Sequence, residues 1–405
     1  MVTFAGHAYP WDVLGDPGFV DRVGDLGLDS VTVAASYHSA RAATPLHPRR
    51  QLVDARHAAL YRPVRAQAWA GQLLTPGVPT WLDTTDGFGE SARVLSDAGI
   101  PVNAWIVLTH STRLGEAHPQ VAVRNCFGES YPYALCPSHE AVRQYAATLA
   151  SEAVHDTPVA SVSLEACGQL GLTHLGHHEK TDGAWTPQAT RWLSVCCCTG
   201  CQAGWRDRGL DPDAVTATLR AAVRAEAVGE SAPPSDELAT ALLANRHAAT
   251  DRLRGEVLAA VRTAAPTASV TLHANPDPWA TGPSVGITDR TAAEVDAILV
   301  PAWPTTGESA DTVAKAAEHG RPVDAYVTVL PPTRHDAIAG HIRGLVEAGA
   351  TRFSLYHLGL APAWRQNWFS ELRRPLYDRR EHRRRHRKSR QGGSRVRRAV
   401  GDGTT

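Results

Sequence analysis

Hydrophobic positions along the chain follow two alternating patterns. Short β-branched or alternating runs predict strands, and longer stretches with apolar residues every three or four positions predict amphipathic helices. Eight strands are expected, over residues 2–9, 30–38, 101–110, 159–167, 268–276, 295–303, 322–330 and 352–360. Helices are expected between most of them, over residues 16–27, 87–99, 139–156, 237–266, 309–320, 334–350 and 362–374.

The first of these helices carries start and stop signals. Asp16 is expected to cap it, Pro17 suits its first turn, and Gly27 is expected to end it. The remaining helices are predicted from their apolar spacing alone.

The alternation of strands and helices over residues 1–372 predicts one α/β domain, a (β/α)8 TIM barrel. An open, doubly wound sheet is the alternative, but no glycine-rich phosphate turn follows any of the expected strands. Long insertions are expected after strands two and four, over residues 39–86 and 168–236. In a barrel, both would lie on the face where the βα loops gather.

Charge is unevenly distributed, although the whole chain is neutral. Residues 373–405 hold 13 Lys or Arg against 3 Asp or Glu, and they contain few large apolar residues. We expect a basic disordered tail there, because burial cannot offset the entropy lost on ordering it. Such a tail suits non-specific contact with nucleic acid or an acidic surface; the rest of the chain predicts no nucleic-acid partner.

No stretch of the chain approaches the ~18 uninterrupted apolar residues of a membrane span. The first residues do not combine a basic segment with an apolar run, so they do not read as a signal peptide. The seven cysteines form an odd set that fits reduced thiols. These features predict a cytoplasmic protein without a membrane partner.

Polar and aromatic residues stand at or just beyond the carboxyl end of almost every expected strand. A strand core of Val, Ile and Ala has no packing reason to end in this way so often, and in an α/β barrel those ends line one cavity. The residues are Tyr9, Trp11, Asp12, Tyr37, His38, His110, Glu165, His273, Asn275, Asp277, Trp303, Glu308, Thr328, Tyr356 and His357.

Glu165 ends the fourth strand among apolar neighbours. Such surroundings disfavour its charged form and raise its pKa, which suits a general acid at neutral pH. An ion pair with an arginine is the alternative reading. A glycosidase needs a second carboxylate, and the catalytic candidates after strands five and six are Asp277 and Glu308. Further options are Asp12, Glu179 and Asp182.

Strand-end rings are expected to bind substrate, because aromatic faces stack on sugar rings and imidazoles hydrogen-bond hydroxyls. Plain core packing is the alternative for any single ring, including Trp105 and Trp279. The predicted substrate-binding residues are Tyr9, Trp11, Tyr37, His38, His110, His273, Trp303, Tyr356 and His357.

Two sets of residues suggest a metal. The strand-end histidines, with His174, His177, His178 and Glu179 in the loop after Glu165, could hold a catalytic divalent ion. Separately, Cys196, Cys198 and Cys201 have the CxCxxC spacing of a structural zinc site. Its fourth ligand would be Cys197, Cys167 or a loop histidine such as His177, and free packed thiols are the alternative.

Residues 124–207 resemble a family of bacterial hypothetical glycosyl-hydrolase-like barrels. The resemblance rests on "YALCPSHEAVRQYAATLASEAV", on the strand that ends in an acid and on "CCCTGC". It implies a (β/α)8 fold and a carbohydrate-related role, with Glu165 at the general acid/base position of the wider retaining clan. The nucleophilic glutamate of that clan ends strand seven, where this chain has Val329, Leu330 and Pro331.

Together, these features predict a glycoside hydrolase that acts on a small carbohydrate by carboxylate acid/base catalysis. No cofactor is required for this chemistry, and zinc would have a structural role. Two alternatives stay open: a sugar-binding barrel without catalysis, and a metal-dependent hydrolase or isomerase that uses the strand-end histidines.

Overall fold

The computed structural model describes residues 2–174, 180–181 and 183–372. The predicted tail over residues 373–405 lies outside the described residues. The same holds for His177, His178, Glu179 and Asp182 of the loop after Glu165.

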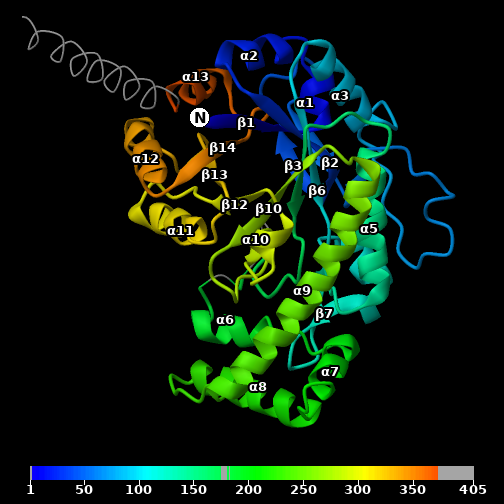
Figure 1. The fold of residues 1–405 in the computed structure, drawn as a ribbon, viewed down its shortest axis with the longest axis vertical. Coiled ribbons are helices and arrows are strands. Elements are labelled where there is room, and N and C mark those ends of the chain that lie inside the picture. The colour runs from blue at the N-terminus through cyan, green and yellow to red at the C-terminus, as the bar shows by residue number, and fades with distance from the viewer. Residues whose placement is uncertain (1, 175–179, 182, 373–405) are drawn as a thin grey trace, which may run out of the picture.

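Eight parallel strands close into a barrel, so the predicted fold is confirmed (Figure 1). Neighbours are hydrogen-bonded in the order β1-β14-β13-β12-β10-β9-β6-β2, and β2 pairs with β1 to complete the ring. The eight strands match the eight hydrophobic runs. They are β1 (Thr3–Ala8), β2 (Ser30–Tyr37), β6 (Val102–Val107), β9 (Ser161–Glu165), β10 (Ser269–Asn275), β12 (Ala297–Pro301), β13 (Val323–Thr328) and β14 (Ala350–Tyr356).

The seven predicted helices are present, and they lie outside the barrel (Figure 1). Their apolar faces are buried; in the helix after β13, for example, Ile338, Ile342 and Leu345 are covered. The helices are α2 (Phe19–Leu26), α3 (Gly87–Asp97), α5 (Glu140–Val154), α9 (Asp236–Ala264), α11 (Gly307–Ala317), α12 (His335–Glu347) and α13 (Ala363–Glu371).

The start of α2 differs from the prediction. A short helix, α1 (Pro10–Gly15), precedes it, and Asp16 follows α1 instead of capping α2. The Asp16 carboxylate accepts a hydrogen bond from the backbone N–H of Gly18 and pairs with Arg22. Gly27 ends α2 as expected, with a φ of 62° that glycine adopts without a steric penalty.

The insertion after β2 contains three short strands. β3 (Ala40–Ala43) and β4 (Leu52–Ala55) form an antiparallel hairpin, and β5 (Ala59–Leu60) pairs antiparallel with the end of β2. A further insertion, which the hydrophobic pattern did not predict, follows β6. It holds α4 (Thr112–Ala117), the 3-10 helix η1 (Pro119–Val121) and the hairpin of β7 (Ala122–Arg124) and β8 (Ser130–Leu135).

The insertion after β9 contains three helices. α6 (Pro187–Leu193), α7 (Thr199–Arg206) and α8 (Pro212–Ala227) lie below the barrel in Figure 1, beside the first half of α9. We call these helices the helical appendage. It has a hydrophobic core of its own, built around Trp192, Trp205, Leu219 and Leu242.

The connection from β10 to β12 interrupts the alternation of strands and helices. It contains β11 (Val285–Gly286), which pairs with β10, and the single turn α10 (Thr291–Glu294). Strand five is therefore not followed by a full helix.

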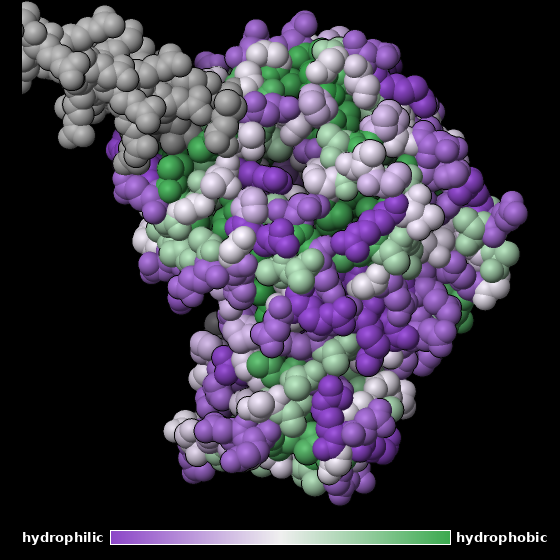
Figure 2. Space-filling view, viewed as in Figure 1, coloured by the Kyte–Doolittle hydropathy of each residue, from purple (hydrophilic) through white to green (hydrophobic). Residues whose placement is uncertain are grey.

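On the face shown in Figure 2, hydrophobic residues form small patches separated by hydrophilic ones. Among the described helices, none has the length and apolar character needed to cross a membrane.

Candidate active site

Glu165 is the last residue of β9, and only 4% of its surface is exposed. The indole Nε1–H of Trp105, on the neighbouring strand β6, donates a 2.8 Å hydrogen bond to Glu165 Oε2. On the other side, His273 of β10 places its Nδ1 3.7 Å from the same oxygen. The carboxyl group therefore lies inside the barrel, between side chains of two adjacent strands.

Local backbone geometry explains why the strand ends at this carboxylate. Ala166 has a φ of 52°, a left-handed conformation that non-glycine residues rarely adopt and that turns the chain out of the sheet. The Thr109 hydroxyl lies 2.7 Å from the carbonyl oxygen of Ala166 and 2.8 Å from that of Gly168. This strained turn directly after Glu165 fixes the position of the carboxyl group.

Burial raises the pKa of Glu165 to about 7, and the hydrogen bond from Trp105 opposes this shift. Burial lowers the pKa of His273 to about 3, so its imidazole is neutral near pH 7. Glu165 therefore exchanges its proton close to neutral pH beside an uncharged imidazole.

Replacing Trp105 with phenylalanine is expected to raise the pKa of Glu165 further. The variant keeps an aromatic ring but loses the N–H donor that stabilises the carboxylate, and the change should be on the order of one pKa unit. Infrared titration of the carboxyl band measures it. Trp303→Phe is the matched control, because Trp303 stacks on Tyr356. An unchanged Glu165 pKa in Trp105→Phe would contradict the assigned role of the indole.

Aromatic and imidazole rings form a connected wall around Glu165. Trp105 lies 4.5 Å from Tyr37 between ring centroids, and Tyr326 lies 5.6 Å from Tyr356 on the other side. The nine predicted substrate-binding side chains all belong to this wall: Tyr9, Trp11, Tyr37, His38, His110, His273, Trp303, Tyr356 and His357.

The nine residues differ in accessibility. Trp303 is 40% exposed, and Tyr356, His38 and His110 are half-buried. The other five are buried: Tyr9, Trp11, Tyr37, His273 and His357. The first group is therefore partly accessible from solvent, whereas the second is packed in the interior.

Two members of the wall were not predicted. His7 of β1 is fully buried, and its ring lies 4.8 Å from both Trp105 and Tyr326. Tyr326 of β13 lies 5.7 Å from His273. Both precede the strand ends, and the alternation of inward-facing positions along β1 and β13 is the signal that could have found them.

The strand-end histidines lie in separate places. His38 and His110 stack at 4.4 Å, and His110 Nε2 lies 3.1 Å from Nε2 of His174. His273 lies beside Glu165, and His357 lies beside Tyr9 at 4.3 Å. Within the described ranges, the only group of three or more metal-ligating atoms within 4.8 Å of one another consists of cysteines.

The two main candidates for the partner carboxylate, Asp277 and Glu308, are both exposed. Asp277, two residues after β10, accepts a hydrogen bond from the backbone N–H of Trp279. Glu308 is exposed in the first turn of α11. Asp12 is buried instead, where it accepts a hydrogen bond from the backbone N–H of Tyr9, and burial raises its pKa to about 7.

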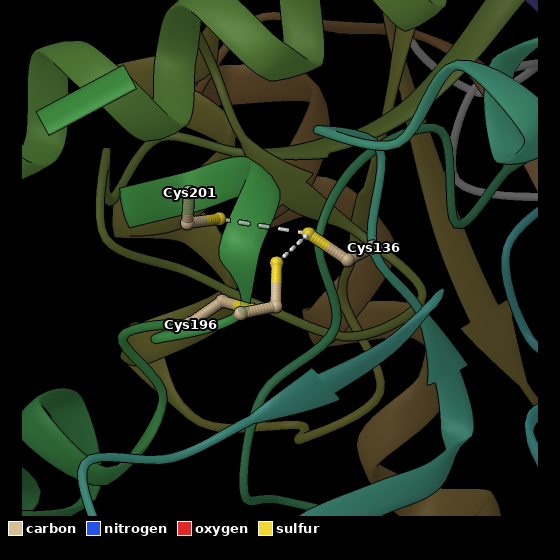
Figure 3. A group of neighbouring side chains, drawn as sticks. Cys136, Cys196 and Cys201 are labelled. Atoms are coloured by element: carbon tan, nitrogen blue, oxygen red, sulfur yellow. Dashed lines mark hydrogen bonds between the residues drawn. The ribbon is translucent and has the colours of Figure 1, made fainter. Parts of the chain in front are cut away.

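Four buried cysteines form a compact cluster at the junction of the barrel and the helical appendage. The predicted thiols Cys196, Cys198 and Cys201 are brought together, and the fourth comes from Cys136, directly after β8. Figure 3 shows Cys136 and Cys201 pointing toward each other, with their sulfurs 3.6 Å apart. Cys136 and Cys198 are separated by the same distance.

The fourth thiol is thus neither Cys197 nor Cys167, the sequence candidates. The Cys197 thiol points to the carbonyl oxygen of Val195 and packs in the core of the appendage. Cys136 stands 60 positions before the CxCxxC segment, in the insertion that the sequence pattern missed, and no spacing rule connects the two.

The geometry of the cluster fits zinc. Zn–S bonds of ~2.3 Å in a tetrahedron place the sulfurs ~3.8 Å apart, close to the 3.6 Å separations found here. Four sulfur ligands leave no open coordination position, which is typical of a structural site.

Several solved structures are similar to this one. They include α-L-fucosidase isoenzyme 2 from Paenibacillus thiaminolyticus, with a TM-score of 0.57 and 13% identity over 92% of this chain and 49% of that one. The chain thus spans about half of the fucosidase. The PgaB (BpsB) glycoside hydrolase domain from Bordetella bronchiseptica has a TM-score of 0.57 and 15% identity, over 92% of this chain and 99% of that one.

The catalytic domain of β-amylase from Paenibacillus polymyxa gives a TM-score of 0.55 and 12% identity, covering 91% of this chain and 97% of that one. No family profile and no curated protein matches the sequence. At these identities, the likeness concerns the fold. The chain therefore has the (β/α)8-barrel fold that its sequence resemblance implied.

Proposed function

We propose that this protein is a glycoside hydrolase in which Glu165 is the proton donor. The observation that carries the proposal is a buried carboxyl group with a pKa near 7, at the carboxyl end of a barrel strand. A general acid is most effective when its pKa lies near the working pH. The similar structures, an α-L-fucosidase, a glycoside hydrolase domain and a β-amylase, support the same reaction class.

The substrate is a small carbohydrate. Trp303 and Tyr356 stack at 5.0 Å and offer an aromatic surface at the mouth of the site. His38 and His110 offer imidazoles to sugar hydroxyls on another side of the wall. A sugar bound between these two pairs would place its glycosidic oxygen toward Glu165.

In the reaction, Glu165 gives its proton to the glycosidic oxygen as the bond to the anomeric carbon breaks. A water molecule then attacks that carbon and loses its proton to a second carboxylate, Asp277 or Glu308. Both residues follow strands near β9 in the barrel order, β10 directly and β12 one strand further. A carboxylate acting through water suits inversion of configuration, since the strand-seven position of the retaining nucleophile holds Val329.

Turnover is expected to fall as pH rises through about 7. Glu165 must be protonated to act, its pKa is raised to about 7, and its protonated fraction drops above that value. The measurement is the hydrolysis rate of a panel of aryl glycosides and natural disaccharides, taken from about pH 5 to about pH 9 in steps of about half a unit. It shows whether turnover falls above about pH 7. A pH profile that rises above pH 7 would exclude Glu165 as the acid.

A second candidate is a sugar-binding barrel without turnover. It is favoured by the exposure of Asp277 and Glu308 and by a β13 that ends in Thr328. If a broad panel of glycosides is left unhydrolysed while calorimetry shows sugar binding, this candidate replaces the first.

A further inference from the structure

The amino-terminal half of the barrel lumen is lined by small polar side chains. TIM-barrel interiors are normally filled by layers of branched apolar side chains. Here, hydroxyl and amide groups from five strands occupy these positions: Thr32, Asn103, Ser161, Ser163, Thr271 and Ser354.

These small side chains leave a cavity of about 300 Å³. At ~30 Å³ per water molecule, it has room for about ten waters. Asp324 of β13 also lines it and is 7% exposed. One of its oxygens accepts a hydrogen bond from the Ser354 hydroxyl, while Oδ1 has no hydrogen-bond partner in the described part of the chain. A buried carboxyl oxygen without a protein partner indicates that water occupies this cavity.

Ser163 connects the cavity to Glu165. It lines the cavity, and its Oγ lies 2.9 Å from Nε2 of His273. The other ring nitrogen, Nδ1, faces Glu165 Oε2 at 3.7 Å. The Ser163 hydroxyl, the His273 imidazole and the Glu165 carboxyl group therefore form a line from the cavity to the site. The imidazole must move slightly toward Glu165 for Nδ1 to reach hydrogen-bond distance of Oε2.

The carboxyl group of Glu165 is enclosed on its other sides. The ionisable groups that face it come from several strands: Tyr37 of β2, Tyr326 of β13 and Tyr356 of β14 all interact with its charge. His7 of β1 lies against Trp105 and interacts with His273. Burial keeps the pKa of each of the three tyrosines above its usual value and that of His7 below it, so these four groups keep their protonation state near pH 7.

We propose that the cavity at the amino-terminal end of the barrel supplies Glu165 with protons through Ser163 and His273. A hydronium ion in the cavity gives a proton to Ser163 Oγ, whose own proton passes to His273 Nε2. The proton on Nδ1 moves to Glu165 Oε2. One hydronium and one carboxylate thus become one water and one carboxylic acid, and nothing is oxidised or reduced. The imidazole then carries its proton on Nε2, and the ring must flip by rotation about its side-chain bond before the next transfer.

This relay rests on the proposed function, because an inverting glycosidase loses the proton of its acid in every cycle and must regain it from solvent. Reprotonation through the barrel floor would proceed while a sugar still covers the upper mouth of the site. The relay itself, however, is measurable without any substrate.

The relay is tested by a pH jump of about three units, from about 9 to about 6, which crosses the pKa of Glu165. Rapid-mixing infrared spectroscopy then measures how fast the carboxylate is protonated. The band is assigned by subtracting the trace of Glu165→Gln, since Asp12 and Asp324 titrate in the same range. Ser163→Ala should slow protonation on the order of 10²-fold. Ser163→Thr keeps the hydroxyl and should restore the rate.

Ser161→Leu places a bulky apolar side chain in the cavity and leaves Ser163 and His273 in the sequence, so it should also slow protonation. It provides a second test if the Ser163→Ala variant fails to fold. Equal rates in wild type, Ser163→Ala and Ser161→Leu would overturn the relay. Because no sugar is present, an enzyme that hydrolyses nothing can still show the relay, and an active enzyme can fail to show it.

Discussion

Glu165→Gln is expected to lower kcat on the order of 10²–10⁴-fold for glycosides with a sugar or alkyl leaving group. The amide keeps the shape of the side chain and can accept the hydrogen bond from Trp105 Nε1, but it has no proton to give. KM should change little, because Trp303 and Tyr356, the rings proposed to contact the sugar, stay in place. Steady-state kinetics on a disaccharide measure the effect.

The leaving group provides an internal control. A dinitrophenyl glycoside needs no protonation, so the variant should hydrolyse it with a much smaller loss. Glu371→Gln, the same change on the surface helix α13, controls for the chemistry of the substitution. Undiminished turnover of the disaccharide by Glu165→Gln would remove Glu165 from the mechanism.

The same assay identifies the second carboxylate. Asp277→Asn and Glu308→Gln each remove one candidate base from an exposed position, where neither change disturbs the core. Loss of activity in only one variant, on both kinds of substrate, assigns the base, since water activation is needed whatever the leaving group.

We propose that Cys136, Cys196, Cys198 and Cys201 hold one structural Zn²⁺. Cys136→Ser is expected to abolish zinc binding and to cost several kcal/mol of stability, because metal-binding free energy in a structural site is folding free energy. Elemental analysis and thermal unfolding measure the two effects. The loss should be greatest in the helical appendage, since Cys198 and Cys201 belong to the start of α7.

Cys197→Ser is the matched control. It removes a thiol of the same segment, equally buried, whose sulfur points away from the cluster to the carbonyl oxygen of Val195. This variant should keep its zinc. Wild-type protein that contains no zinc after purification without chelators, and that is unchanged by added zinc, would refute the site.

The barrel was predictable because each strand carries its own signal. β2, β9 and β13, for example, are short apolar or alternating runs, and the segments on either side of each lack that pattern. The hairpin of β7 and β8 was missed because its alternation is weak and it lies between two stronger elements. The helices α6 and α8 were also missed; their apolar residues pack against each other in the core of the appendage and not on the barrel.

The site was predictable only as a set of strand ends. That Glu165 and the nine ring-bearing residues lie near one another could be predicted because parallel strands bring their carboxyl ends together; their role in binding or catalysis stays a prediction. The direction of each side chain and its contacts could not be predicted in this way. The hydrogen bond from Trp105 to Glu165 and the exposure of Asp277 were therefore seen only in the structure. Cys136 was missed because its approach to Cys201 depends on two insertions that meet in space.

The helix α9 belongs to two hydrophobic cores at once. Leu242, near its start, packs in the core of the helical appendage, whereas Val257, Leu258 and Val261 pack in the core of the barrel. A transplant of the appendage onto another barrel must therefore cut inside this helix, in register with its turns, and not in the loops on either side. An excision at the loops would leave a barrel with the apolar stripe around Leu242 exposed to water, and such a protein should aggregate.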